Sequence, residues 1–349
     1  MKQFAVMLWR PAGRLFFVLM AVASAASVLA CNGNAESDTG EAQPLVIYSG
    51  RSESLVGPII EQFEELTGID VQVNYGSTGP LAATLLEEGS NTPADIFFAQ
   101  DPGGLGTVIE MLDTLPSEVT GRVPDWARSP DDKWVGISGR ARVLVYSTEA
   151  LTEDELPQSI DQLTDPRWKG KLGWAPGNSS FQAMVTGMRQ IWGEARTREW
   201  LEGIVANEAR VYPNNSSQVA AAADGEIHIG MVNHYYLYRF LAEEGEDFKA
   251  RNWFTPEADP GSVVLVAGAG VLRESDNREA AIKFLEFMLS SVGQQFFATQ
   301  THEYPLIEGV IPDRGLPPLD SISKPTIDLS TLGDLENTQQ LLREVGALS

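Results

Sequence analysis

The sequence has few of the residues on which catalytic and metal sites usually depend, since its 349 residues include one cysteine and three histidines. A single cysteine excludes an intrachain disulfide framework and a cysteine-rich zinc site. Basic residues are scarce too: 25 lysines and arginines stand against 48 acidic residues, a formal net charge of −23. That balance argues against nucleic-acid binding and against docking of the folded surface on anionic lipid. Oxygen atoms, a few imidazoles and backbone dipoles are left to form a site.

Common catalytic motifs are also missing. The sequence contains neither a Walker-type phosphate loop nor a G-x-S-x-G nucleophile elbow, and its histidines lack the helical spacing of paired metal ligands. What is present is an ordinary globular composition, 43% hydrophobic and 21% charged, in a chain long enough for two domains or one large one. We therefore predict a protein that is not an enzyme.

The first 30 residues have the pattern of a secretory signal. Lys2, Arg10 and Arg14 precede an apolar or small-residue run over 15–30, which is too short for a comfortable membrane span. Residues 27–31 (SVLAC) resemble the bacterial lipobox, which predicts lipidation of Cys31; the alternative is an ordinary cleaved signal with an incidental cysteine. The stretch that follows is polar and acidic, which predicts a flexible tether. The cysteine and this tether together span residues 31–43.

From residue 44 the pattern alternates between strand and helix. Strands are predicted at 45–48, 71–75, 95–100, 135–146, 209–212, 227–232 and 262–267, with amphipathic helices between most of them. Repeated β-α units predict a parallel sheet covered on both faces. Two such series, joined by strand-like crossings near 126–146 and 258–268, predict two lobes with a hinge and a ligand cleft at the carboxyl ends of the strands. The predicted N-terminal lobe is 44–142 and 264–316, and the C-terminal lobe is 143–263 and 317–349.

Tyr235 and Tyr236 directly follow a predicted strand, in the position where α/β proteins place ligands. One interpretation is a hydrophobic anchor for the next helix. The other is that both phenol oxygens enter the cleft. Phenolate is a hard anionic donor that suits a highly charged cation. Nearby positive charge favours deprotonation of the tyrosine phenol, despite its ordinary pKa of about 10.

Arg140 and Arg142 share one face of the predicted strand 135–146, together with Tyr146. In so acidic a chain they indicate a bound anion or a buried carboxylate partner, or else a salt bridge between the lobes.

Small polar residues precede several predicted helices, notably at 77–79, 178–180 and 214–216. They are typical of N-caps, but several helix starts converging on one cleft would form an anion site. Glu53 follows the first strand and could offer its carboxylate to a ligand.

Seven collinear blocks resemble the bacterial ferric-iron-binding proteins of ABC importers, within the class 2 periplasmic-type solute-binding proteins. These blocks are 48–55 (YSGRSESL), 93–106 (PADIFFAQDPGGLG), 138–146 (SGRARVLVY), 168–182 (WKGKLGWAPGNSSFQ), 233–236 (NHYY), 268–272 (GAGVL) and 303–306 (EYPL). The resemblance implies a two-lobed periplasmic-binding-protein type II fold, in which each lobe is a mostly parallel sheet flanked by helices and two strands form the hinge.

The resemblance also implies a ligand set. Fe(III) would be held by Tyr235 and Tyr236, with a synergistic anion such as phosphate or carbonate. The family's anion positions correspond to Asn178, Ser179, Ser180, Asn215 and Asn233, with Arg140 or Arg142 as the nearby charge. We expect a monomeric protein of the cell envelope, lipid-anchored on the outer face of the cytoplasmic membrane or in the periplasm, which touches the membrane only through its lipid and delivers iron to an ABC permease.

The sequence departs from the family in the first lobe. The histidine that many members carry after the first strand is Ser52 here, and the glutamate that some carry after the third strand is Gln100. Replacement ligands could come from Glu53, Tyr48, Asp101 or Tyr146, or from a water and the anion. Alternatives to iron binding are the same fold binding an organic or oxyanion solute, with the tyrosines stacked on it, and an envelope enzyme or sensor-partner domain.

Overall fold

The computed structural model describes residues 43–348. The predicted signal segment, Cys31 and the tether up to residue 42 lie outside the described residues. The strands are β1 (Leu45–Ser49), β2 (Val71–Tyr75), β3 (Ile96–Ala99), β4 (Val135–Ser147), β5 (Leu172–Trp174), β6 (Arg210–Val211), β7 (Ile229–Asn233), β8 (Ala250–Trp253) and β9 (Val264–Val271). The α-helices are α1 (Glu53–Thr67), α2 (Thr78–Glu88), α3 (Pro102–Thr107), α4 (Ser117–Thr120), α5 (Ser179–Trp192), α6 (Glu194–Ala206), α7 (Asn215–Ala223), α8 (Tyr235–Glu244), α9 (Arg278–Met288), α10 (Ser291–Gln300) and α11 (Leu335–Glu344).

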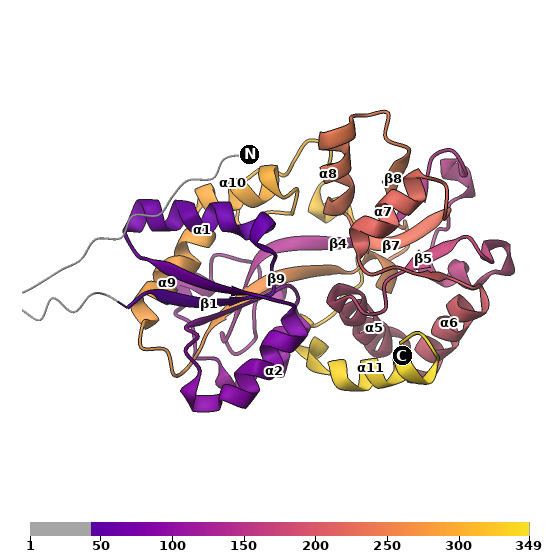
Figure 1. Ribbon diagram of the computed structural model, residues 1–349. Coiled ribbons are helices and arrows are strands. Elements are labelled where there is room, and N and C mark those ends of the chain that lie inside the picture. Colours follow the sequence, from indigo (N-terminus) through magenta and orange to yellow (C-terminus); the bar gives the residue numbers. More distant parts are fainter. Residues whose placement is uncertain (1–42, 349) are drawn as a thin grey trace, which may run out of the picture. The chain divides into compact units, whose positions relative to one another are not determined.

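The first lobe is built on β2-β1-β3-β9-β4, in which β1 pairs in parallel with β2 and β3 while β9 runs antiparallel to β3 and β4. Figure 1 shows α1, α2, α9 and α10 around this part of the sheet. Helix α1 buries apolar residues at helical spacing, and Phe63 among them meets Phe284 of α9 edge to face at 5.3 Å. The helix ends at Gly68, which adopts the left-handed conformation at φ 69° and donates its N–H to Glu64.

Strand β4 belongs to both lobes. Along its 13 residues it changes partner: residues 135–141 pair with β9, and residues 142–146 pair with β7. Beyond β7 the second lobe continues with parallel β5 and β6, and β8 pairs with the end of β4. The predicted fold class, an α/β protein of two lobes with crossing strands, is confirmed. The predicted lobe boundaries remain a prediction.

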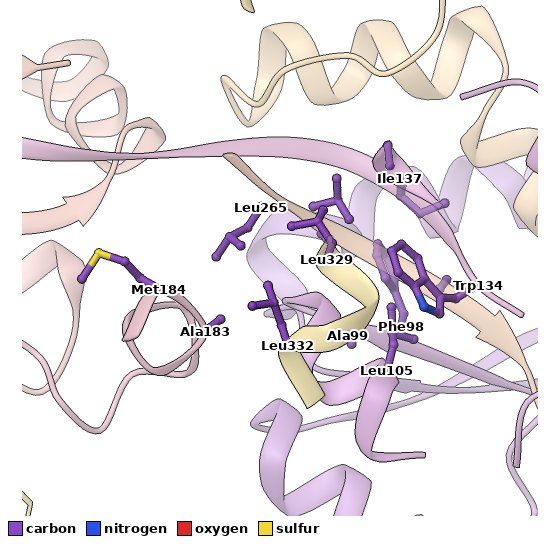
Figure 2. Close-up of a cluster of buried hydrophobic side chains, with 14 of the residues drawn as sticks. Phe98, Ala99, Leu105, Trp134, Ile137, Ala183, Met184, Leu265, Leu329 and Leu332 are labelled. Carbon is purple, nitrogen blue, oxygen red and sulfur yellow. The ribbon is translucent and has the colours of Figure 1, made fainter. Parts of the chain in front are cut away.

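The C-terminal segment contacts helices of both lobes. A short 3-10 helix, η9 (Leu329–Gly333), packs on α3 of the first lobe, and α11 packs on α5 of the second. Figure 2 shows Leu332 between Leu105 of α3 and Ala183 of α5. Thr338 of α11 lies 2.8 Å from Thr186 of α5, oxygen to oxygen.

The structure differs from the sequence-based elements mainly where elements are short. Strand β5 is absent from the predicted strands, because its three residues are too few to show a period. Neither β8 nor α10 was predicted. Between α10 and α11 the chain also forms two short 3-10 helices, Leu319–Ser321 and η9. None of the helices within residues 43–348 is long and apolar enough to cross a membrane.

Candidate functional site

Tyr235 and Tyr236 are the first two residues of α8, directly beyond β7. Their rings stack with centroids 4.4 Å apart, and the Tyr235 side chain is fully buried. Its hydroxyl makes no hydrogen bond to any described residue, a deficit that costs about 1–3 kcal/mol in a buried group. Burial, together with the charge of a neighbouring phenolate at Tyr235, raises the pKa of Tyr236. Tyr236 is thus neutral at pH 7 unless a cation binds beside it.

Three buried arginines surround this pair, and we call Arg51, Arg140 and Arg142 the arginine cluster. Each is at most 1% exposed. Arg51 lies two residues beyond the end of β1, and its guanidinium carbon lies 5.9 Å from the ring centroid of Tyr235. Arg140 and Arg142 project from the same face of β4, at the point where the strand changes partner. The charges of Arg51 and Arg140 act on Tyr236, which places the cluster beside the phenols.

The arginine cluster carries more positive charge than the described residues around it neutralise. Arg51 forms an ion pair with the buried carboxylate of Glu303, which also accepts a hydrogen bond from Ser138 at 2.5 Å. Burial alone would lower the pKa of Arg51, but the attraction of Glu303 raises it. For Arg140 and Arg142 no ion pair occurs within residues 43–348. Burial, and next the charge of Arg140, lower the pKa of Arg142 to about 9.

Several N–H groups of the cluster have no acceptor. Among the described residues, both Nε and Nη1 of Arg51, Nε of Arg140, and Nε and Nη2 of Arg142 are buried without a hydrogen bond. Buried polar groups are normally satisfied, and uncompensated buried charge is expensive. The cluster is therefore fitted to receive negatively charged oxygen atoms.

Amide and hydroxyl side chains complete the site. Ser180 accepts hydrogen bonds from Arg140 Nη1 and from Gln100 Nε2, both at 3.0 Å, and so joins α5 of the second lobe to the end of β3 in the first. Arg142 Nη1 donates to the Oδ1 atoms of Asn233 (3.0 Å) and Asn215 (3.4 Å). The Nδ2 groups of both asparagines are buried without an acceptor in the described chain.

The remaining predicted anion residues lie at the start of α5. Asn178 is the N-cap, and its Oδ1 accepts from the backbone N–H groups of Ser180 and Phe181 at 3.2 and 3.4 Å. Ser179 is the first helical residue and is half-buried. The structure therefore brings together residues from four separated segments: Tyr235, Tyr236, Arg140, Arg142, Ser180, Asn215 and Asn233, with Asn178 and Ser179 adjoining them.

The candidate replacement ligands of the first lobe lie away from the arginine cluster or are engaged elsewhere. The Tyr48 hydroxyl donates to Glu88 at 2.9 Å, at the end of α2. Glu53 is exposed in the first turn of α1, beside an equally exposed Ser52. Asp101 caps α3 by accepting from Gly104.

Tyr146 does not join the arginine cluster either. It lines a separate cavity of about 650 Å³, together with Tyr238 and Arg251. Within residues 43–348 no group of three or more histidine, cysteine, aspartate or glutamate side chains could hold a metal ion.

Sequence reasoning assigned no role to Arg51 or Glu303. Arg51 had a usable signal, because it comes shortly after the first strand and so lies near its carboxyl end. Glu303 had none, since its pairing with Arg51 joins positions 252 residues apart.

The chain is similar to known proteins over most of its length. Residues 91–318 match the family described as bacterial extracellular solute-binding protein. The major ferric iron-binding protein of Neisseria meningitidis serogroup B is 32% identical over 309 residues, covering 86% of this chain and 92% of that protein. The structure of iron-bound HitA from Pseudomonas aeruginosa superposes with a TM-score of 0.83 at 32% identity, covering 87% of this chain and 99% of that one. A Trichodesmium protein in complex with iron and citrate has a TM-score of 0.76 at 30% identity, with 87% and 99% coverage.

Proposed function

Because the chain belongs to the bacterial extracellular solute-binding proteins, we propose that it captures ferric iron together with an anion and delivers it to an ABC permease. The observation that carries the proposal is the stacked pair of phenols, one with a buried and unpartnered hydroxyl, lying beside the arginine cluster. Fe(III) is a hard cation that prefers oxygen ligands, and its charge would lower the pKa of both phenols. Relatives that cover most of the chain are named for ferric iron.

The anion follows from the charges. Two phenolates would balance the excess of the three arginines over Glu303, so that bound Fe(III) would leave a net positive site unless an oxyanion accompanied it. Phosphate or carbonate would accept from the free N–H groups of Arg140 and Arg142 and from the amides of Asn215 and Asn233. On the α5 side, Asn178, Ser179 and Ser180 would complete the anion site.

The first lobe offers little metal coordination in this proposal. Ser52 and Gln100 occupy the positions at which relatives of this kind carry ligands, and Tyr48, Tyr146 and Glu53 are engaged or exposed elsewhere. The anion and water would therefore fill the coordination sites that the two phenolates leave open. We propose no turnover, so the protein acts by binding alone.

Capture would use closure of the two lobes. The hydrogen bond from Gln100 of the first lobe to Ser180 of the second would help to hold the closed state. The proposed location is the outer face of the cytoplasmic membrane or the periplasm, with Cys31 as the lipid attachment site and the protein as a monomer.

Iron loading tests the proposal. The purified protein, loaded aerobically with Fe(III) in the presence of phosphate, should develop the visible charge-transfer band of a ferric phenolate. Replacing both Tyr235 and Tyr236 by phenylalanine should abolish the band and the affinity, whereas Tyr48→Phe and Tyr146→Phe should leave both unchanged. A colourless loaded protein, or a double variant with unaltered affinity, would reject ferric binding at this site.

A second candidate function has its own observation in the unpartnered guanidinium groups, which would also suit an anionic organic solute without iron. Calorimetric titration of metal-free protein with inorganic phosphate and with an organic phosphate separates the two. Ferric capture predicts weak anion binding that tightens when iron is added. Tight binding of an organic anion that iron does not alter favours the second candidate.

A further inference from the structure

His234 connects the tyrosine pair to the strand that joins the lobes. It is fully buried between Asn233, the last residue of β7, and Tyr235, the first residue of α8. Its backbone is already helical, at φ −56° and ψ −39°, so the chain leaves the sheet here. The position of His234 therefore sets the direction in which α8 and its two tyrosines start.

The imidazole of His234 takes the place of a backbone carbonyl as a hydrogen-bond acceptor between β4 and β7. The register of β4 with β7 puts Ala141 opposite His234, and the His234 N–H donates to the Ala141 carbonyl at 3.0 Å. The reciprocal bond cannot form, because the His234 carbonyl has turned away and accepts from Asn252 at 2.7 Å. Instead the Ala141 N–H donates to Nδ1 of the His234 ring at 3.1 Å. His234 therefore still makes two hydrogen bonds to Ala141 of β4, although its backbone has left the sheet. Ala141 is the residue after which β4 changes its partner from β9 to β7.

The other ring nitrogen reaches the segment that carries Glu303. Since Nδ1 accepts from Ala141, the proton is on Nε2, which donates to the carbonyl of His302 at 2.7 Å. The adjoining Tyr304 is bonded to Gly139 of β4 in both directions, and Glu303 between them holds Arg51. One imidazole therefore links the start of α8 to β4 and to the support of Arg51.

We propose that His234 is a positioning residue for ferric binding: it orients Tyr235 and Tyr236 relative to the arginine cluster through its bonds to Ala141 and His302. This inference rests on the proposed function. A group that orients metal ligands without touching the metal commonly affects metal affinity by about 10- to 100-fold.

The test compares four variants of the purified protein with wild type. His234→Phe removes both bonds, His234→Asn keeps an acceptor near the Nδ1 position, and His234→Gln keeps a donor near the Nε2 position. His228→Phe is the matched control, because His228 lies just before the opposite end of β7. Fe(III) affinity is measured by competition with citrate, the ferric-phenolate band by visible spectroscopy, and the stability of metal-free protein by thermal unfolding.

We expect His234→Phe to weaken Fe(III) affinity about 10- to 100-fold and to shift the visible band, with the Asn and Gln variants between it and wild type and the control unchanged. A His234→Phe protein with a lower melting temperature but wild-type affinity and band would overturn the positioning role and leave ferric binding intact. If His234→Phe does not fold, wild-type affinity and band in both the Asn and Gln variants would overturn it equally. A wild-type protein that binds no iron would instead overturn the proposed function, and this inference with it.

Discussion

Replacing Arg142 by methionine should stabilise the metal-free and anion-free protein while weakening its binding. Burial and Arg140 lower the pKa of Arg142 to about 9, against an ordinary value of about 12.5. At about 1.4 kcal/mol per pH unit, keeping this guanidinium charged costs on the order of 5 kcal/mol. Its two hydrogen bonds, to Asn233 and Asn215, return about 1.5–3 kcal/mol, because they share one Nη1 and the longer is 3.4 Å.

The balance for Arg142→Met is therefore a gain of about 2–3.5 kcal/mol in the free energy of unfolding, or about 3–5 °C in melting temperature. The assay is thermal unfolding followed by circular dichroism at pH 7, after iron and phosphate have been removed. In the presence of both, the lost charge-assisted contact to the anion should weaken Fe(III) affinity by about 10- to 100-fold.

Arg198→Met is the control for Arg142→Met. Arg198 forms a solvent-exposed pair with Glu344, so its replacement should leave the melting temperature and the iron affinity close to those of wild type. A metal-free Arg142→Met protein that melts below wild type by several degrees would refute the reasoning. It would show that the folded protein already neutralises the charge of the Arg142 guanidinium, so that the arginine cluster is not an empty anion site.

Three further results are expected. Ser180→Ala should weaken Fe(III) affinity several-fold in a citrate competition, because Gln100 and Arg140 lose their shared acceptor; unchanged affinity would exclude this contact from the closed state. Leu332→Ala should lower the free energy of urea unfolding by about 2–5 kcal/mol, and a cost under 1 kcal/mol would contradict its packing between the lobes. Burial lowers the pKa of His234 to about 4, so the unfolded chain binds its proton first and stability should fall by up to about 3 kcal/mol between pH 6.5 and 4; a His234→Gln variant with the same decline would contradict this assignment.

The sequence was most informative where a strand is long or a motif directly follows one. The long strand-like stretch 135–146 predicted β4, and Tyr235 with Tyr236 could be placed at a carboxyl end from the residues that precede them. Arg140, Arg142 and Tyr146 were expected on one face of the strand. Side chains on the same face are not necessarily close enough to contact the same ligand. Tyr146 lies four residues beyond Arg142, about 13 Å along the strand, and so reaches a different cavity.

What the sequence could not supply was pairing between distant segments. Strand β1 is buried on both sides, so no alternation showed that Tyr48 turns towards Glu88. Likewise, Glu303 lies in an irregular segment after α10, and nothing local identifies it as the partner of Arg51. Such contacts depend on how distant segments of the first lobe pack against each other, which the periodicity of the sequence does not encode.

The pairing of Arg51 with Glu303 also determines when during folding the site can exist. A chain that ended before residue 303 would have to bury the guanidinium of Arg51 without its counter-charge, at a cost of several kcal/mol. The first lobe needs β9 as well, whose residues come more than 150 positions after β3. Contacts of such long range form slowly. A growing chain therefore stays incomplete, with its binding site unformed, until nearly all of the protein has been made.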